Sequence, residues 1–292
     1  MKANEKAKRV DRVMTWIFVA VAGFFILLLI AFALLVIGRG IAGFEPYMLS
    51  FTRDGIGNQL FNTVYLVVLA LLFSVPLGIA TGVYLAEYAK PGKVTHFLSI
   101  CIETLSSLPS IVVGLFGYLV FIVMVGAQWN LVSGALAVSI LNLPLIATTT
   151  KDAMESMPKG YRMGSMGLGA THWQTIRRVL LPACMPRILT GIILAAGRVF
   201  GEAAALLYTA GMSTDINWSN WDITSPTCPL NPFRPGETLA LHIWASRTEA
   251  IRPDAAQIAN FSSAVLLILV FAFSIGARVL GRRMERKLAG GK

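Results

Sequence analysis

Two oppositely charged residues lie close together in an otherwise apolar stretch of the sequence, residues 188–211. Arg198 and Glu202 are four positions apart, so they share a face if this stretch forms one continuous helix. A charge near the middle of a bilayer costs roughly 2.5–3.5 kcal/mol, and such residues are therefore usually paired or functional. One interpretation is a buried ion pair that locks helices together. The other, which we favour, is a translocation path in which the guanidinium binds an oxyanion and Glu202 balances its charge at rest.

The composition of the chain is that of a membrane protein. Of its 292 residues, 55% are hydrophobic and only 14% are charged, and the mean hydropathy is +0.67. Soluble domains carry about 25% charged residues. Several apolar runs reach about 20 residues, the length at which a helix crosses a ~30 Å hydrocarbon core. We predict an all-α membrane protein with six transmembrane helices at residues 16–37, 61–84, 110–125, 131–149, 188–211 and 258–279.

The distribution of basic residues predicts the orientation of these helices. With the N-terminus inside, 19 lysines and arginines lie in inner segments, 5 lie in outer loops, and Arg198 lies within a span. This excess places both termini in the cytoplasm of a bacterial inner membrane. The net charge of +10 belongs to loops and termini and not to a separate basic domain, so no nucleic-acid partner is expected.

Two of the segments between the predicted spans, 151–187 and 212–257, are too long to be simple connections. Residues 93–109 are expected to be amphipathic and not to cross the membrane, because His96 and Glu103 interrupt the apolar pattern. Residues 151–187 form a basic cytoplasmic loop. Residues 212–257 contain Trp218, Trp221 and Trp244 and several prolines, which favours a structured cap at the outer interface over an irregular tether.

Motifs for catalysis are missing from the sequence. The chain has no GxxxxGK[ST] phosphate-binding loop and no HExxH motif, and its three histidines and three cysteines lack metal-ligand spacing. No Ser/His/Asp set is indicated either. We therefore expect no catalytic residue, no metal and no cofactor in this chain.

The cytoplasmic loop has the pattern of a short helix, a turn and a second helix. Residues 161–168 can form the first helix, Gly169 permits the turn, and Thr171 is a good N-cap for the second helix. Pro182 is expected to end that second helix. The apolar face of the second helix contains Trp173, Ile176 and Leu180.

This loop resembles a motif of bacterial ABC importer permeases, EAA–x3–G–x9–I–x–L–P. Here Gly169 is followed by nine residues and then by Val179, Leu181 and Pro182 at the motif positions, whereas Met163 stands where the family has its acidic residue. In that family the loop is the coupling helix, which docks into a groove of the ATP-hydrolysing subunit. The resemblance therefore implies an ATPase contact that involves Gly169, Trp173, Ile176, Val179, Leu181 and Pro182.

Four strings in order, PLGIATGVYLAEYA, LPSIVVGLFGYLV, GATHWQTIRRVLLPA and GRVFGEAAALLYTA, resemble the PstA-type permeases of phosphate-specific ABC importers. The resemblance implies that Arg198 and Glu202 line the substrate path. The family commonly has an arginine where LPLIATTT places Thr148, so one fixed positive charge is missing. The hydroxyl groups of Thr148 and Thr149 are the remaining candidates there, and a partner permease is expected to supply the charge.

The resemblance also implies the assembly in which this chain works. It predicts a type I ABC importer permease fold in a single domain, 1–292, with a cytoplasmic tail (1–15), a first helix and outer loop (16–60), a permease core (61–281) and a second tail (282–292). The chain would form the phosphate channel with a PstC-like permease, a PstB-like ATPase dimer that binds ATP and magnesium, and an external PstS-like phosphate-binding protein. Two alternatives stay open: a permease for molybdate or sulfate, and an ion-coupled carrier that uses Arg198 and Glu202 as a proton relay.

Overall fold

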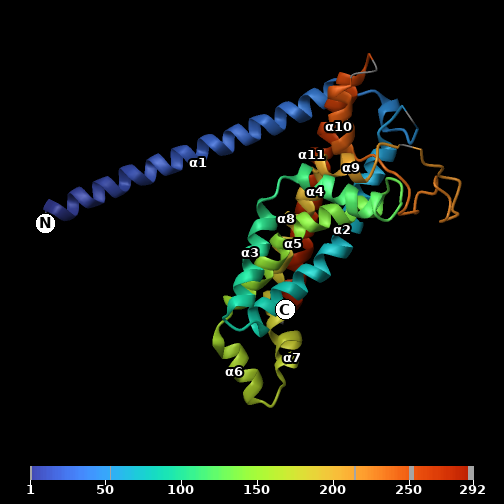
Figure 1. The fold of residues 1–292 in the computed structure, drawn as a ribbon. Coiled ribbons are helices and arrows are strands. Elements are labelled where there is room, and N and C mark those ends of the chain that lie inside the picture. Colours follow the sequence, from blue (N-terminus) through green and yellow to red (C-terminus); the bar gives the residue numbers. More distant parts are fainter. Residues whose placement is uncertain (1, 53, 214, 250–252, 289–292) are drawn as a thin grey trace.

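The computed structural model describes residues 2–52, 54–213, 215–249 and 253–288, and the regular elements among them are helices (Figure 1). Three π-helical turns, Tyr84–Tyr88, Tyr118–Val123 and Ile176–Leu180, follow α2, α4 and α7, and a 3-10 turn spans Pro46–Leu49. The α-helices are α1 (Lys2–Ala42), α2 (Gly57–Val83), α3 (Lys93–Ser107), α4 (Ser110–Gly117), α5 (Leu131–Glu155), α6 (Lys159–Gly167), α7 (His172–Thr175), α8 (Leu181–Phe200), α9 (Ala204–Thr209), α10 (Leu239–Thr248) and α11 (Ala255–Leu288).

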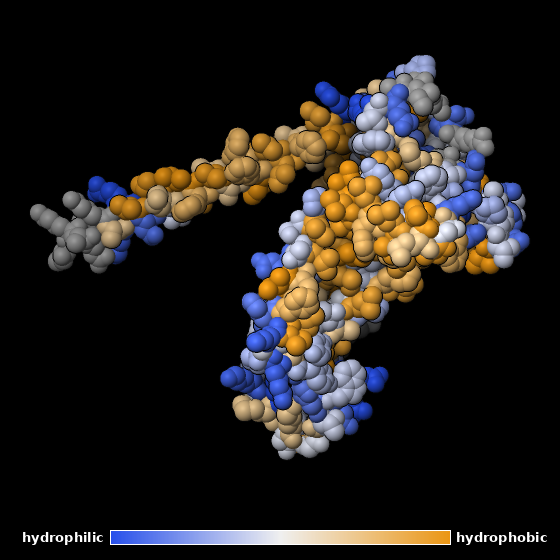
Figure 2. Space-filling model, viewed as in Figure 1, coloured by the Kyte–Doolittle hydropathy of each residue, from blue (hydrophilic) through white to orange (hydrophobic). Residues whose placement is uncertain are grey.

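Five helical stretches of the described residues are long and apolar enough to cross a membrane, and there are six if a bent pair of helices is counted as one span. Figure 2 shows apolar residues along α1 and the middle of the bundle, with hydrophilic residues at the two ends of the bundle. The bent pair joins α3 to Ser110–Val123 at an angle of 103°. Ser110–Val123 is only about 21 Å long, too short to cross alone. The third predicted span, 110–125, is therefore shorter in the structure than a full crossing, and the bend of 103° turns α3 away from its axis.

The bend between α3 and α4 has a local cause. Leu108 has an extended backbone, with a ψ of 133°, and Pro109 follows it. A residue before proline is pushed out of the helical region, so the helix ends there. As predicted, α3 is amphipathic, and none of its residues is buried.

At the centre of the bundle, α2 and α8 pack against α5. Gly78 and Gly82 of α2 lie against Ile146 and Thr150 of α5, where an added Cβ would come within 2.7 and 2.5 Å of side-chain atoms. On another side of α5, Thr149 lies against Gly191 of α8. Small residues at these positions let helix backbones approach closely, as is common between membrane helices.

The predicted fifth span, 188–211, is not one helix. Helix α8 ends at Phe200, residues 201–203 are not helical, and α9 begins at Ala204. The helix also begins earlier than predicted, because the π-helical turn Ile176–Leu180 connects α7 to α8 in one candidate span, His172–Phe200. Pro182 lies in the first turn of α8, so the prediction that it ends the helix is wrong. The helical stretch continues through Pro182, directly after the π-helical turn.

The outer loop 212–257 is a structured cap in its described part. Arg234 is 1% exposed, and its guanidinium donates hydrogen bonds to the carbonyl oxygens of Pro229 and Pro235 and to Asn62 Oδ1 of α2. Burial lowers the pKa of Arg234 to about 10. Trp218 donates to Asn58 Oδ1 at 3.0 Å. These contacts favour the cap over the tether.

Candidate functional site

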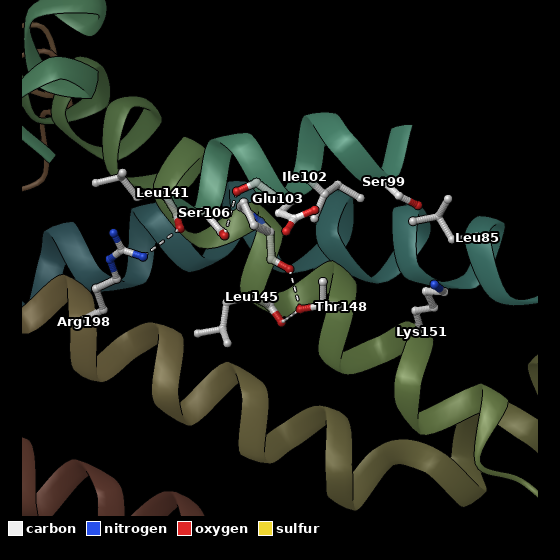
Figure 3. Close-up of a pocket in the computed structure, with 11 residues that line it drawn as sticks. Leu85, Ser99, Ile102, Glu103, Ser106, Leu141, Leu145, Thr148, Lys151 and Arg198 are labelled. Carbon is white, nitrogen blue, oxygen red and sulfur yellow. Dashed lines mark hydrogen bonds between the residues drawn. The ribbon is translucent and has the colours of Figure 1, made fainter. Parts of the chain in front are cut away.

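A cavity of about 440 Å³ lies between α3, α5 and α8. Figure 3 shows its lining, with Arg198 on α8, Thr148 and Lys151 on α5, and Glu103 on α3. The polar lining residues are Ser99, Glu103, Ser106, Thr148, Lys151 and Arg198, and the apolar ones are Leu85, Ile102, Leu141, Pro144 and Leu145. Two cations and three hydroxyl groups in one cavity form a set of groups that suits an anion with several oxygen atoms.

Arg198 lies in the last turn of α8, and its side chain is exposed to the cavity. Its Nη1 donates to the carbonyl oxygen of Leu141 at 3.3 Å. Among the described residues, no carboxylate lies within ion-pair distance of its guanidinium. Because a guanidinium has five N–H donors, most of them remain for a ligand.

Glu202 does not have the predicted position. It follows the end of α8, is 8% exposed, and accepts a hydrogen bond from the backbone N–H of Ala205 at 3.1 Å. The carboxylate therefore caps the first turn of α9 and does not line the cavity. The prediction that Arg198 and Glu202 form a pair is wrong, because the helix that would align the two residues breaks at Gly201.

The two predicted threonines point to different places. Thr148 lines the cavity, and its hydroxyl donates to the carbonyl oxygen of Pro144 at 2.8 Å. Its oxygen therefore remains as an acceptor. Thr149 does not line the cavity; it packs against Gly191, and its hydroxyl donates to Leu145 O at 2.6 Å. Of the two, only Thr148 is in a position to contact a ligand.

Lys151 and Glu103 are site residues that the sequence reasoning missed. Lys151 lies three positions after Thr148 on α5, so both side chains share the face that lines the cavity. Its Nζ lies 3.8 Å from Glu155, which makes a partly exposed and therefore weak ion pair. The spacing of Thr148 and Lys151 was a sequence signal for this second cation. Glu103 had no such signal, because α3 was expected to lie apart from the spans.

The loop between α5 and α8 has the predicted helix–turn–helix form. Gly169 has a φ of +86°, and Thr171 forms a capping box with Gln174 at the start of α7. Figure 1 shows α6 and α7 projecting from one end of the bundle. This shape suits insertion into a groove of a partner.

A buried carboxylate attaches this loop to α2. Glu87, in the π-helical turn that follows α2, accepts hydrogen bonds from Nε and Nη2 of Arg162, and its Oε2 lies 3.2 Å from His172 Nε2. The hydrogen bond with Glu87 raises the pKa of Arg162. Arg162 also donates to the carbonyl oxygens of Met154 and Met157. Glu87 therefore ties both helices of the loop to the bundle.

The predicted docking residues divide into exposed and buried ones. Trp173 is 56% exposed and Gly169 is exposed, whereas Val179, Leu181 and Pro182 are partly buried. Ile176 is 1% exposed and packs with the buried core around Met154, so the expectation that it contacts a partner is wrong. Leu168, at the tip of the loop, was not predicted, although it is 91% exposed.

Comparison with known proteins identifies the family. Residues 74–290 match the family described as binding-protein-dependent transport system inner membrane component. The chain belongs to this family. The probable ABC transporter permease protein YqgI of Bacillus subtilis (strain 168) is 50% identical over 235 residues, 80% of this chain and 80% of that protein. The phosphate transport system permease protein PstA of Xylella fastidiosa (strain 9a5c) is 34% identical over 229 residues, 78% of this chain and 75% of that protein.

Solved structures establish the fold of the permease. A bacterial ABC transporter that imports the acidic polysaccharide alginate matches with a TM-score of 0.63 at 16% identity, over 97% of this chain and 99% of that chain. The inward-facing MetNI methionine ABC transporter matches with a TM-score of 0.58 at 19% identity, over 82% of this chain and 99% of that chain. The predicted type I ABC importer permease fold is thus confirmed.

Family membership also sets the general role of this permease. It is a membrane-spanning transport component, and the family works with ATPase subunits, a substrate-binding protein and a homologous permease. ATP hydrolysis belongs to the ATPase subunits and not to the permease. The cavity around Arg198 therefore belongs to a protein whose task is to move a substrate across the membrane.

Proposed function

We propose that this permease forms part of the path for inorganic phosphate in an ATP-driven importer of a bacterial inner membrane. The observation that carries the proposal is the cavity in which Arg198 and Lys151 face one space together with Thr148. Guanidinium and ammonium groups are the side chains that bind phosphate oxygens best. Lys151 supplies the positive charge that the arginine at position 148 supplies in PstA-type permeases. Relatives that are named phosphate transport permeases support the same substrate.

The carboxylate of Glu103 favours phosphate over the rival oxyanions. A carboxylate repels a fully ionised anion but accepts a hydrogen bond from an anion that carries a proton. Phosphate at neutral pH carries at least one O–H group, whereas sulfate and molybdate carry none. With two cations and one carboxylate in the lining, the cavity attracts anions weakly overall, which suits a site that must release its substrate.

We further propose that the loop couples this path to ATP hydrolysis. Among the exposed apolar residues of the loop, Leu168 and Trp173 dock into the ATPase, and Glu87 transmits the movement of the loop to α2. Both termini lie in the cytoplasm. A PstC-like permease, a PstB-like ATPase dimer that binds ATP and magnesium, and a PstS-like binding protein complete the transporter. The chain itself binds no cofactor.

Uptake by the reconstituted transporter tests the substrate. The permease is purified with the subunits that accompany it, reconstituted into liposomes containing ATP, and supplied in turn with labelled phosphate, sulfate and molybdate. We expect ATP-dependent accumulation of phosphate alone, and with Glu103→Gln we expect sulfate uptake to rise relative to phosphate. Accumulation of sulfate or molybdate without phosphate by the unaltered protein would overturn the proposal.

A further inference from the structure

A second polar cavity lies between α8 and α11, away from the cavity that contains Arg198. It measures about 180 Å³. Its polar lining consists of Arg278, Arg282 and Thr190, and its apolar lining includes Pro186, Leu189 and Ile193. Neither arginine belongs to the cavity between α3, α5 and α8, so the proposed phosphate path leaves this site unexplained.

The site is shaped by a tight crossing of the two helices. Gly281 of α11 is buried, and an added Cβ there would overlap Leu189 Cδ2 of α8. The backbones therefore approach closely at Gly281, and the cavity lies beside this contact. Helix packing therefore sets the distance between the two helices that form the walls of the cavity.

The two arginines of this cavity have no carboxylate partner among the side chains that the structure describes. They are four residues apart on α11, where like charges face each other and destabilise the helix. Both are exposed, and neither forms an ion pair with any residue that the structure describes. The hydroxyl of Thr190 donates to the carbonyl oxygen of Pro186 at 3.1 Å, so the arginines are the donors that remain. An anion placed between them would relieve the repulsion and accept several hydrogen bonds.

The position of the cavity selects the kind of anion. Its α11 lining, Arg278 to Arg282, lies near the C-terminal end of that helix, and its α8 lining begins at Pro186, five residues after α8 starts. The cavity therefore lies toward the end of the bundle from which the basic loop projects (Figure 1). By the charge rule this end faces the cytoplasm. Apolar residues continue from the cavity along the helices, since Leu189 and Ile193 line it and the exposed Ile275 lies one turn before Arg278. A phosphate group with attached acyl chains fits both the arginines and the apolar residues beside them, whereas a free phosphate would contact only the arginines.

We propose that this cavity binds the phosphate group of an anionic phospholipid of the cytoplasmic leaflet, with the acyl chains lying along α8 and α11. Basic pockets between transmembrane helices on the cytoplasmic side are suited to such headgroups. The bound lipid would hold α8 and α11 together at the end nearest the loop. The inference stands on the fold and does not depend on which substrate the permease carries.

Lipid binding to the assembled transporter tests the proposal. The complex is purified in detergent and titrated with phosphatidylglycerol or phosphatidylcholine, and bound lipid is counted by native mass spectrometry. The double variant Arg278→Gln/Arg282→Gln is compared with Arg283→Gln, which removes an exposed charge from the same helix outside the cavity. We expect the double variant to bind phosphatidylglycerol at least about tenfold more weakly, and Arg283→Gln to bind it as the unaltered complex does.

Two results would overturn the proposal. Equal phosphatidylglycerol binding by the double variant and by Arg283→Gln would show that the two arginines do not form the site. Displacement of the lipid by submillimolar inorganic phosphate would assign the arginines to a free anion. Retention of phosphatidylglycerol in millimolar phosphate, together with weak binding of phosphatidylcholine, would support the lipid. Because Arg278 and Arg282 are exposed, the substitutions leave the packed core intact.

Discussion

Arg198 is the residue with the clearest assignment to the proposed path. It faces the cavity without a carboxylate partner among the described residues, and only one hydrogen bond to Leu141 O holds it. The bond to a neutral carbonyl leaves the full positive charge available. Glu202, which was expected to compensate that charge, instead holds the start of α9. The two residues should therefore respond differently to substitution.

Replacement of Arg198 by glutamine should reduce phosphate uptake at least about a hundredfold, because the loss of a charge-assisted bidentate contact is worth about 3 kcal/mol. The measurement is ATP-dependent uptake by reconstituted transporter, with co-purification of the ATPase as the assembly check. Arg187→Gln is the matched control, since Arg187 is exposed and donates to Ser156 Oγ outside the cavity. Normal uptake by Arg198→Gln would contradict the assignment.

Lys151 should be the second cation of the path. Lys151→Met should lower uptake about tenfold, and Lys151→Arg should retain most of it, because the charge and not the shape is needed. The double variant Thr148→Arg/Lys151→Met returns a cation to the position that PstA-type permeases use, so it should restore part of the uptake. Initial uptake rates over a range of phosphate concentrations measure both effects. If Lys151→Met transports as the unaltered protein does, Lys151 does not belong to the path.

The sequence predicts which residue types form the site more easily than it predicts which of these residues come together in the cavity. A charge in an apolar run is visible without a structure, and so Arg198 was found. Which residues meet in the cavity depends on where the helices break. The predicted position of Glu202 was wrong because no helix break was predicted at Gly201, although a glycine is a visible signal for one. Glu103 was missed because its contact with the cavity depends on how α3 folds back toward α5, which a local pattern does not contain.

At the scale of elements, apolar length predicted the helices well and their interruptions poorly. The predicted spans 61–84, 131–149 and 258–279 each lie within a helix or its π-helical extension. The interruptions depend on local chemistry, such as Pro109 at the bend between α3 and α4. Pro182 misled the prediction in the other direction, because the helical stretch passes from a π-helical turn into α8 at this proline and does not end there.

The outer cap depends on one buried arginine. Arg234→Met would leave the carbonyl oxygen of Pro229 and Asn62 Oδ1 without their donor, at a cost of about 2–4 kcal/mol in the free energy of unfolding. Thermal unfolding of the purified complex measures this loss as a lower midpoint. Arg247→Met is the control, because Arg247 is exposed and donates to Asn260. Equal midpoints for the two variants would show that Arg234 does not hold the cap.

For the whole molecule, we propose that the loop 151–187 connects transport with ATP hydrolysis. Leu168→Glu/Trp173→Glu should release the ATPase from the membrane, because two carboxylates would oppose apolar docking, while both side chains are exposed and the bundle is undisturbed. Co-purification of the ATPase measures the effect. The control Trp221→Glu/Ile223→Glu alters another exposed apolar pair, in the outer cap, and should leave the ATPase bound. Retention of the ATPase by the loop variant would exclude docking through these residues.

The walls of the cavity around Arg198 are not equally firm. Helices α5 and α8 meet through Gly191 and Thr149, so their spacing is set, whereas α3 has no buried residue. A change of cavity size during the transport cycle should therefore come from displacement of α3. Since Glu103 belongs to α3, such displacement would remove the carboxylate and leave both cations in place. The cavity would then discriminate between protonated and fully ionised anions only while Glu103 lines it. In the other part of the transport cycle, a fully ionised anion could enter by mistake.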